Sequence, residues 1–200
     1  MSVPTSGAVG VEAVPAERAT FFCGKLWFWL PIVPLVALDL VSKHLVFAFM
    51  AARRHVQYEV FDWADKVKFS LVEVTNKGTI WGLGQSLHLP LVVLRFFAIA
   101  LIVFFASRTP RRHRTQLCVL GVILAGAIGN LWDNLTNPEP SLSGGGGVRD
   151  FLLFEFGAKG SAYQFPAFNV ADSCITCGAI LLAIMLLRQP SPPPADKALR

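Results

Sequence analysis

Charged residues are scarce in this sequence. Only 16% of its 200 residues are Asp, Glu, Lys or Arg, and 54% are hydrophobic, whereas about a quarter of the residues are charged in an average soluble domain. This composition excludes an ordinary soluble domain and favours a membrane bundle. The formal net charge of +5 does not indicate nucleic-acid binding, because arginines crowd between two apolar runs, as they do in cytoplasmic loops of membrane proteins.

Several catalytic signatures are also missing. The sequence has no GxSxG elbow and no HExxH zinc motif, and its four histidines are scattered along the chain. The CxxC from Cys174 to Cys177 has no second CxxC or histidine partner. Three of the four cysteines lie within apolar runs, which argues against a disulfide framework. We therefore predict no metal site and no cofactor, and interpret the cysteines as packing residues.

Long apolar runs are present instead, and they set the predicted fold. A transmembrane helix needs about 20 apolar residues, and four stretches are candidates: roughly Leu26–Met50, Leu87–Ala106, Leu117–Leu131 and Ala167–Leu187. The first is too long for a cleaved signal peptide and lacks a clean small-residue cleavage site. The sequence thus predicts an α-helical integral membrane protein with four transmembrane helices.

The basic residues predict its orientation, because short cytoplasmic loops are rich in Lys and Arg. Four arginines at 108–114 separate the second and third runs, so this loop and both termini are expected on the cytoplasmic side. The predicted organisation is a disordered cytoplasmic tail (1–22), a membrane domain (23–188) with extracytoplasmic segments at about 51–86 and 132–166, and a cytoplasmic tail (189–200).

The two outer segments differ in character. Residues 66–75, KVKFSLVEVT, begin with the alternation of polar and apolar residues that is typical of a half-buried strand, and NKG follows with turn residues. We expect a small extracytoplasmic β-sheet against the membrane surface. Residues 137–147, NPEPSLSGGGG, indicate a flexible insertion and not a phosphate loop, because no Gly-Lys-Ser/Thr follows.

Ionisable residues in or beside membrane helices are costly and are candidates for function. Asp39 and Lys43 are four residues apart and share a helix face, so they form either a structural ion pair or part of a reactive site. Asn130 and Asp133 also share a face, either as a polar helix end or as a support that hydrogen-bonds the segments above the helix.

Asp150 and Asp172 lie in aromatic settings next to an apolar run. Asp172 falls in the first turn predicted for the fourth helix, where the helix dipole favours a carboxylate, and Asn169 could cap that turn. Helix capping and a surface-loop position are the ordinary explanations for the two residues. The alternative is a pair that shares one proton, since two close carboxylates do not both ionise easily. Such a pair cleaves an amide with activated water.

Five motifs in this order resemble bacterial lipoprotein signal peptidase, the type II signal peptidase, a family of membrane aspartic peptidases. The resemblance runs from about Val36 to Leu187. It is carried by the Asp39 and Lys43 pair, NKGTIWG (76–82), GAIGNLWDN (126–134), VRDF (148–151) and FNVAD (168–172).

The resemblance implies a function and a set of site residues. The family removes the signal peptide from diacylglyceryl-modified prolipoproteins, cutting before the lipidated cysteine at the outer face of the inner membrane. It implies Asp150 and Asp172 as the catalytic pair, supported by Asp39, Lys43, Asn76, Asn130, Asp133 and Asn169. The expected partners are the lipid-modified substrate and membrane lipid, and no nucleic acid is expected to bind. The enzyme is expected to be a monomer.

Three departures from the family pattern bear on these expectations. Asn134 stands where the family usually has Arg, so Arg149, Arg95 or Lys43 is a candidate for the positive partner. Residues 79–81, Thr-Ile-Trp, replace Ala-Ala-Phe, and the Gly-rich insertion is longer than usual. Two other hypotheses are a small membrane transporter that uses Asp39, Lys43 and Arg95 as relay groups, and a catalytically silent relative that binds lipoproteins.

Overall fold

The computed structural model describes residues 24–64, 66–76, 88–137, 147–157 and 162–188. The predicted tails at 1–22 and 189–200 lie outside this range. In chain order, the elements are α2 (Leu26–Trp29), α3 (Ile32–Arg53), β1 (Gln57–Trp63), β2 (Val67–Asn76), α4 (His88–Arg108), α5 (Arg114–Thr136), β3 (Val148–Phe156), β4 (Tyr163–Gln164) and α6 (Val170–Leu187).

The four predicted spans are confirmed. Within the described residues, four helical segments are long and apolar enough to cross a membrane: Leu26–Arg53, Pro90–Arg108, Arg114–Thr136 and Val170–Leu187. The first comprises α2 and α3, and α3 begins directly after Pro31. Proline suits this position because the backbone N–H groups at the start of a helix have no acceptor within the helix.

Helix α5 lies at the centre of the bundle. It packs against α2, α3, α4 and α6, and its core residues Leu117, Leu120 and Leu124 are buried together with Phe28 and Ala106. The other helices keep large apolar side chains exposed, among them Val33 (75%), Phe97 (64%) and Leu187 (86%). Exposed apolar surface of this extent is typical of contact with lipid.

Two glycines allow α5 to approach its neighbours closely. A Cβ atom at Gly126 would collide with the backbone oxygen of Ala171 in α6, and one at Gly129 would collide with Oδ2 of Asp39 in α3. Small residues have this role at helix interfaces in membranes. The close approach brings the polar residues of three helices together at one level.

The predicted sheet is present and has four antiparallel strands in the order β1-β2-β3-β4. Strand β2 matches the strand predicted at residues 66–75. In the register of β2 and β3, Val74 lies opposite Asp150, and the register shifts between Leu71 and Val74. The motif VRDF is therefore the start of a strand and not a surface loop.

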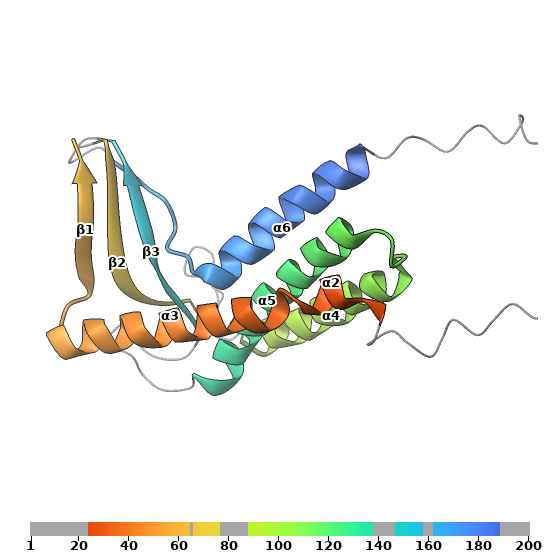
Figure 1. The fold of residues 1–200 in the computed structure, drawn as a ribbon. Helices are drawn as coiled ribbons and strands as arrows, with labels where there is room; N and C mark the ends of the chain where they lie inside the picture. The colour runs from red at the N-terminus through yellow and green to blue at the C-terminus, as the bar shows by residue number, and fades with distance from the viewer. Residues whose placement is uncertain (1–23, 65, 77–87, 138–146, 158–161, 189–200) are drawn as a thin grey trace, which may run out of the picture.

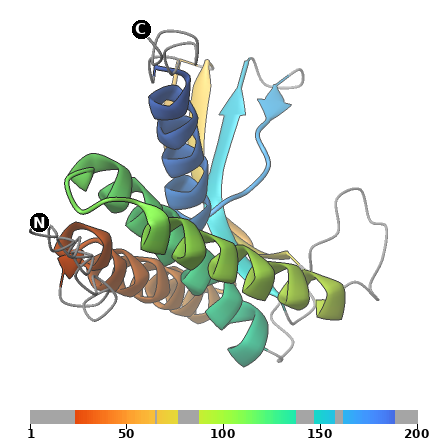
Figure 2. The same ribbon diagram turned by 90° about the vertical axis from the view of Figure 1, so that its right-hand side faces the viewer.

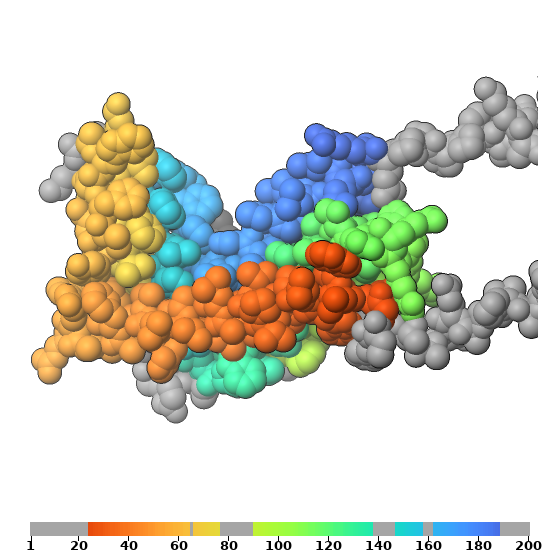
Figure 3. Space-filling view, viewed as in Figure 1, coloured from red at the N-terminus to blue at the C-terminus, as the bar shows by residue number. Residues whose placement is uncertain are grey.

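The sheet stands across one end of α3, and α6 leads away from the sheet on the other side of a gap (Figure 1). In the view turned by 90°, α4 and α5 pass in front of the sheet's base (Figure 2). The space-filling view shows a hollow between the sheet and α6, above α3 (Figure 3). Residues from the helices and the sheet meet near the base of β3.

The helix ends differ from the predicted ones by a few residues. Helix α5 continues to Thr136, past the predicted end at Leu131, because the polar groups of its last turns find partners on other elements. Helix α6 begins at Val170 and not at Ala167, because Asn169 caps it. The apolar runs marked these helices, but their ends depend on side-chain contacts.

Candidate active site

The pair Asp39 and Lys43 lies inside the bundle. Lys43 Nζ donates to Asp39 Oδ2 at 2.7 Å, and both side chains are at most 1% exposed. Asp39 Oδ1 also accepts a hydrogen bond from the backbone N–H of Ala171 at 2.9 Å. The i, i+4 pairing read from the sequence is therefore present. It also ties α3 to the first turn of α6.

Asn130 and Asp133 on α5 both face this pair. Lys43 Nζ donates to Asn130 Oδ1 at 3.2 Å and lies 3.1 Å from Asp133 Oδ2. Asp133 also accepts hydrogen bonds from Arg149 at the start of β3, at 2.9 Å from its backbone N–H and at 3.1 Å and 2.5 Å from Nε and Nη2. The end of α5 thus holds both α3 and the sheet.

Asn169 caps α6 and also reaches the sheet. Its Oδ1 accepts the backbone N–H of Asp172 at 2.8 Å, and Asp172 Oδ2 accepts the backbone N–H of Asn169 at 3.3 Å. This reciprocal pair is a capping box. The other end of the Asn169 amide, Nδ2, donates to Asp150 Oδ1 at 2.7 Å. Helix capping explains the position of Asp172 only in part, because the capping residue Asn169 also contacts Asp150.

Two asparagine amides link the two aspartates. Asn130 Nδ2 donates to Asp172 Oδ1 at 2.7 Å, and Asn130 Oδ1 accepts from Asn169 Nδ2 at 3.2 Å. Each carboxylate therefore receives an amide donor, and the two amides are hydrogen-bonded to one another. The structure brings together Asp150 and Asp172, which are 22 residues apart in the sequence.

Asp150 is 2% exposed. Burial, and after it the negative charge of Asp172, raise the pKa of Asp150 to about 7 from an ordinary value of 3.8. Hydrogen bonds from Asn169 and Asn76, and the charge of Lys43, oppose this rise in the pKa. A buried carboxyl near a second carboxylate keeps its proton to a higher pH because the charged form is poorly solvated and is repelled.

Asn76, the last residue of β2, is thus placed beside Asp150. The residues that follow it, including Thr79, Ile80 and Trp81, lie outside the described residues, as does most of the Gly-rich insertion. All eight site residues named from the sequence meet in one cluster. Among the described residues, no group of three or more His, Cys, Asp or Glu side chains is arranged to hold a metal ion.

Two arginines of the cluster, Arg95 and Arg149, were named from the sequence as candidates for the positive partner but not among the supporting site residues. Arg95 of α4 donates to the backbone oxygen of Asn130 at 3.1 Å, and its charge interacts with Asp172, Asp150 and Asp133. A lone arginine inside an apolar run was the signal for it. Arg149 binds Asp133, next to the buried Asn134. Of the three candidate cations, Arg149 and Lys43 contact Asp133 directly.

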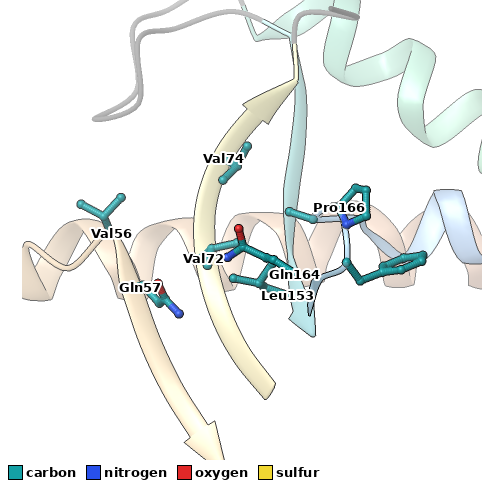
Figure 4. Close-up of a pocket in the computed structure, with 9 residues that line it drawn as sticks. Val56, Gln57, Val72, Val74, Leu153, Gln164 and Pro166 are labelled. Atoms are coloured by element: carbon teal, nitrogen blue, oxygen red, sulfur yellow. The ribbon is translucent and has the colours of Figure 1, made fainter. Parts of the chain in front are cut away.

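A pocket of about 400 Å³ lies along the sheet. Val56, Gln57, Val72, Val74, Leu153, Gln164 and Pro166 line it (Figure 4). Neither aspartate is among the lining residues, but Val74 is the register partner of Asp150. Leu153, another lining residue, lies on β3 like Asp150, so the pocket adjoins the strand that carries this aspartate.

This chain is similar to known proteins in both sequence and fold. The family described as Signal peptidase (SPase) II matches residues 32–188. A lipoprotein signal peptidase of Symbiobacterium thermophilum is 34% identical over 152 residues, which cover 76% of this chain and 88% of that protein. One from Anaplasma phagocytophilum is 34% identical over 160 residues, with 78% and 89% covered.

The fold is similar to that of solved bacterial membrane enzymes. One has a TM-score of 0.62 and 24% identity, over 87% of this chain and 94% of that chain. Another has the same TM-score and identity, over 84% and 96%. These likenesses concern the fold, while the family match covers most of the sequence and confirms the resemblance found there. This chain is a multi-pass membrane protease and belongs to the signal peptidase II family.

Proposed function

We propose that Asp150 and Asp172 are the catalytic pair of an aspartic peptidase that removes signal peptides from prolipoproteins. The observation that carries the proposal is the linkage of these two carboxylates through Asn130 and Asn169. Family membership supports the substrate class. It does not favour the transporter hypothesis.

The charges of the cluster suit a pair that shares one proton. Among the residues that the structure describes, four carboxylates meet three cations there: Asp39, Asp133, Asp150 and Asp172 with Lys43, Arg95 and Arg149. If one carboxyl is protonated, the cluster is neutral. Because charge without a counterion is costly in a poorly solvated site, this protonation state is favoured. The raised pKa of Asp150, about 7, supports Asp150 as the protonated member.

The resting roles are proposed from burial together with the hydrogen bonds, because Asp150 is buried whereas Asp172 is partly exposed. Asp172 accepts N–H donors on both oxygens, from Asn130 and from the backbone of Asn169, which suits an ionised carboxylate. Asp172 then takes a proton from a water molecule as the water oxygen attacks the scissile carbonyl carbon. Asp150 donates its proton to the carbonyl oxygen. As the C–N bond breaks, Asp172 gives its proton to the leaving nitrogen, and one hydroxyl of the tetrahedral intermediate returns its proton to Asp150, which restores the resting pair.

The position of the pair suits a substrate held by the membrane. Asp172 lies in the first turn of the transmembrane helix α6, and Asp150 lies at the start of β3. The sheet and α6 border a hollow in the space-filling view (Figure 3). We propose that a lipid-modified prolipoprotein enters from the bilayer and is cut before its lipidated cysteine. We also propose that the enzyme is a monomer.

The distribution of basic residues supports an orientation. Arginines gather at the loop between α4 and α5, at the opposite end of α5 from Asn130 and Asp133. By the positive-inside rule, this loop and both termini are cytoplasmic and the aspartates lie at the outer face of the inner membrane.

A cleavage assay tests the proposal. Wild type, Asp150→Asn and Asp172→Asn are purified and given a lipid-modified prolipoprotein and its unmodified form. Each substitution is expected to lower the cleavage rate by about 100- to 10,000-fold, and Asp62→Asn, in the exposed strand β1, serves as control. Full activity in either catalytic variant would remove that aspartate from the pair. Binding without cleavage by the wild type would support the silent relative.

A further inference from the structure

Arg149 directs three donors to one carboxylate on another element. Its backbone N–H donates to Asp133 Oδ2 at 2.9 Å, and Nε and Nη2 donate to Oδ1 at 3.1 Å and 2.5 Å. Asp133 is completely buried, and the Arg149 side chain is 19% exposed. Charge-assisted hydrogen bonds from a guanidinium are strong and restrict geometry. Strand β3 is thereby fixed to α5 at residue 149.

The next residue in this strand is Asp150. The backbone of Arg149 is held on both sides, because its N–H donates to Asp133 and its C=O accepts from Asn169 Nδ2 at 3.2 Å. The same Nδ2 donates to Asp150 Oδ1. A shift of residue 149 away from α5 would therefore move Asp150 relative to its amide donor.

Arg149 also completes the charge pairing of the buried acids. Lys43 lies 2.7 Å from Asp39 and 3.1 Å from Asp133, so without Arg149 one ammonium would serve two buried carboxylates. The groups around Asp150 come from every neighbouring helix: Lys43 of α3, Arg95 of α4, Asp133 of α5 and Asp172 of α6. Loss of one cation from this cluster favours the uptake of a proton.

We propose that Arg149 is a positioning residue of the peptidase, which acts through Asp133 to hold Asp150 in place and to keep the buried cluster balanced with a single proton. The inference rests on the proposed function, because it concerns the same pair of aspartates. Arg149 has no hydrogen bond to either catalytic carboxylate among the contacts described for it, so it acts through its partners and does not itself perform chemistry.

The experiment compares Arg149→Met and Arg149→Lys with a matched control. Lys68→Met removes a cation from the same sheet, where Lys68 Nζ lies 3.2 Å from Glu59 and 3.6 Å from Asp62. Cleavage of a lipid-modified prolipoprotein is measured across pH, with kcat and KM separated and the folded fraction determined for each variant.

Arg149→Met is expected to lower kcat by about 10- to 100-fold, the effect of a small misplacement of a reacting group, with KM nearly unchanged. The alkaline limb of its pH–rate profile should move to higher pH, because the pair Asp150 and Asp172 loses its shared proton less readily. Arg149→Lys keeps the charge but loses the planar set of guanidinium donors. The alkaline limb of its pH–rate profile should therefore stay at the wild-type pH while kcat falls. A purely structural role would reduce active enzyme without moving the limb.

The proposal is overturned if Arg149→Met matches Lys68→Met in kcat, or if its alkaline limb stays where the wild-type limb lies. If Arg149→Met does not fold, Arg149→Lys decides the matter by its kcat: a wild-type value overturns the proposal. Asp150→Asn is assayed in parallel. Cleavage by Asp150→Asn defeats the proposed catalytic pair, whereas an inactive Asp150→Asn beside an unaffected Arg149→Met defeats only the role of Arg149.

Discussion

Asp150→Asn should make the protein more stable at neutral and alkaline pH while it removes activity. The folded protein raises the pKa of Asp150 from 3.8 to about 7. A carboxyl with a raised pKa stabilises the fold at low pH, and this contribution is lost as the pH rises from about 4 through about 7. Above that range, the ionised Asp150 destabilises the fold, because it is 2% exposed and repelled by Asp172.

The magnitude follows from the pKa. A rise from 3.8 to about 7 corresponds to about 4 kcal/mol, since one pH unit is 1.36 kcal/mol. Asparagine has nearly the same shape and carries no charge, so it avoids this cost. The variant and the wild type should differ little below about pH 4, and the variant should be more stable by up to about 4 kcal/mol above pH 7.

Thermal or denaturant unfolding in detergent micelles, repeated from pH 4 to pH 9, measures this difference. Asp62→Asn reports the effect of removing a carboxylate from the surface of the same sheet. A stability difference between Asp150→Asn and wild type that is constant across this pH range, or that favours the wild type above pH 7, would refute the reasoning. In that case Asp150 would not be the buried carboxyl that keeps the proton.

Three further substitutions test other contacts of the cluster. Asn169→Ser keeps a capping oxygen but removes an amide donor to Asp150 worth about 1.5–3 kcal/mol. The alkaline limb of the pH–rate profile should therefore move up by about one to two pH units. The control Ser173→Ala loses a hydrogen bond to the Asn169 carbonyl and should leave this limb in place. Gly129→Ala should destabilise the protein by about 1–3 kcal/mol, because the added methyl collides with Asp39 Oδ2, which is held in a buried ion pair. Gly178→Ala collides with the Ile123 side chain, which is not held by an ion pair, and should cost less in thermal unfolding. Lys43→Met should cost about 3–5 kcal/mol, and an Asp39→Asn/Lys43→Met double variant should regain part of that stability; an additive loss would contradict the ion pair.

Several features were predictable from the sequence because their signals are local. The four spans follow from the length of the apolar runs, and the strand at 66–75 from alternation. Asn169 as a cap and Asp39 with Lys43 as a helical pair follow from spacing alone. The motifs VRDF and FNVAD, in order with three others, indicated the two aspartates through the family resemblance.

Other features depend on how the elements pack. Neither the central position of α5 nor the contact of Asn130 with both Lys43 and Asp172 is encoded in any local pattern. The choice of Arg149 as a partner of Asp133 depends on where β3 meets α5. The sequence alone determined which polar residues belong to the membrane domain and which of them lie on the four helices. Only the tertiary structure decided which of them touch, because helix rotation, close approach at Gly126 and Gly129, and strand register are set by packing across the whole fold.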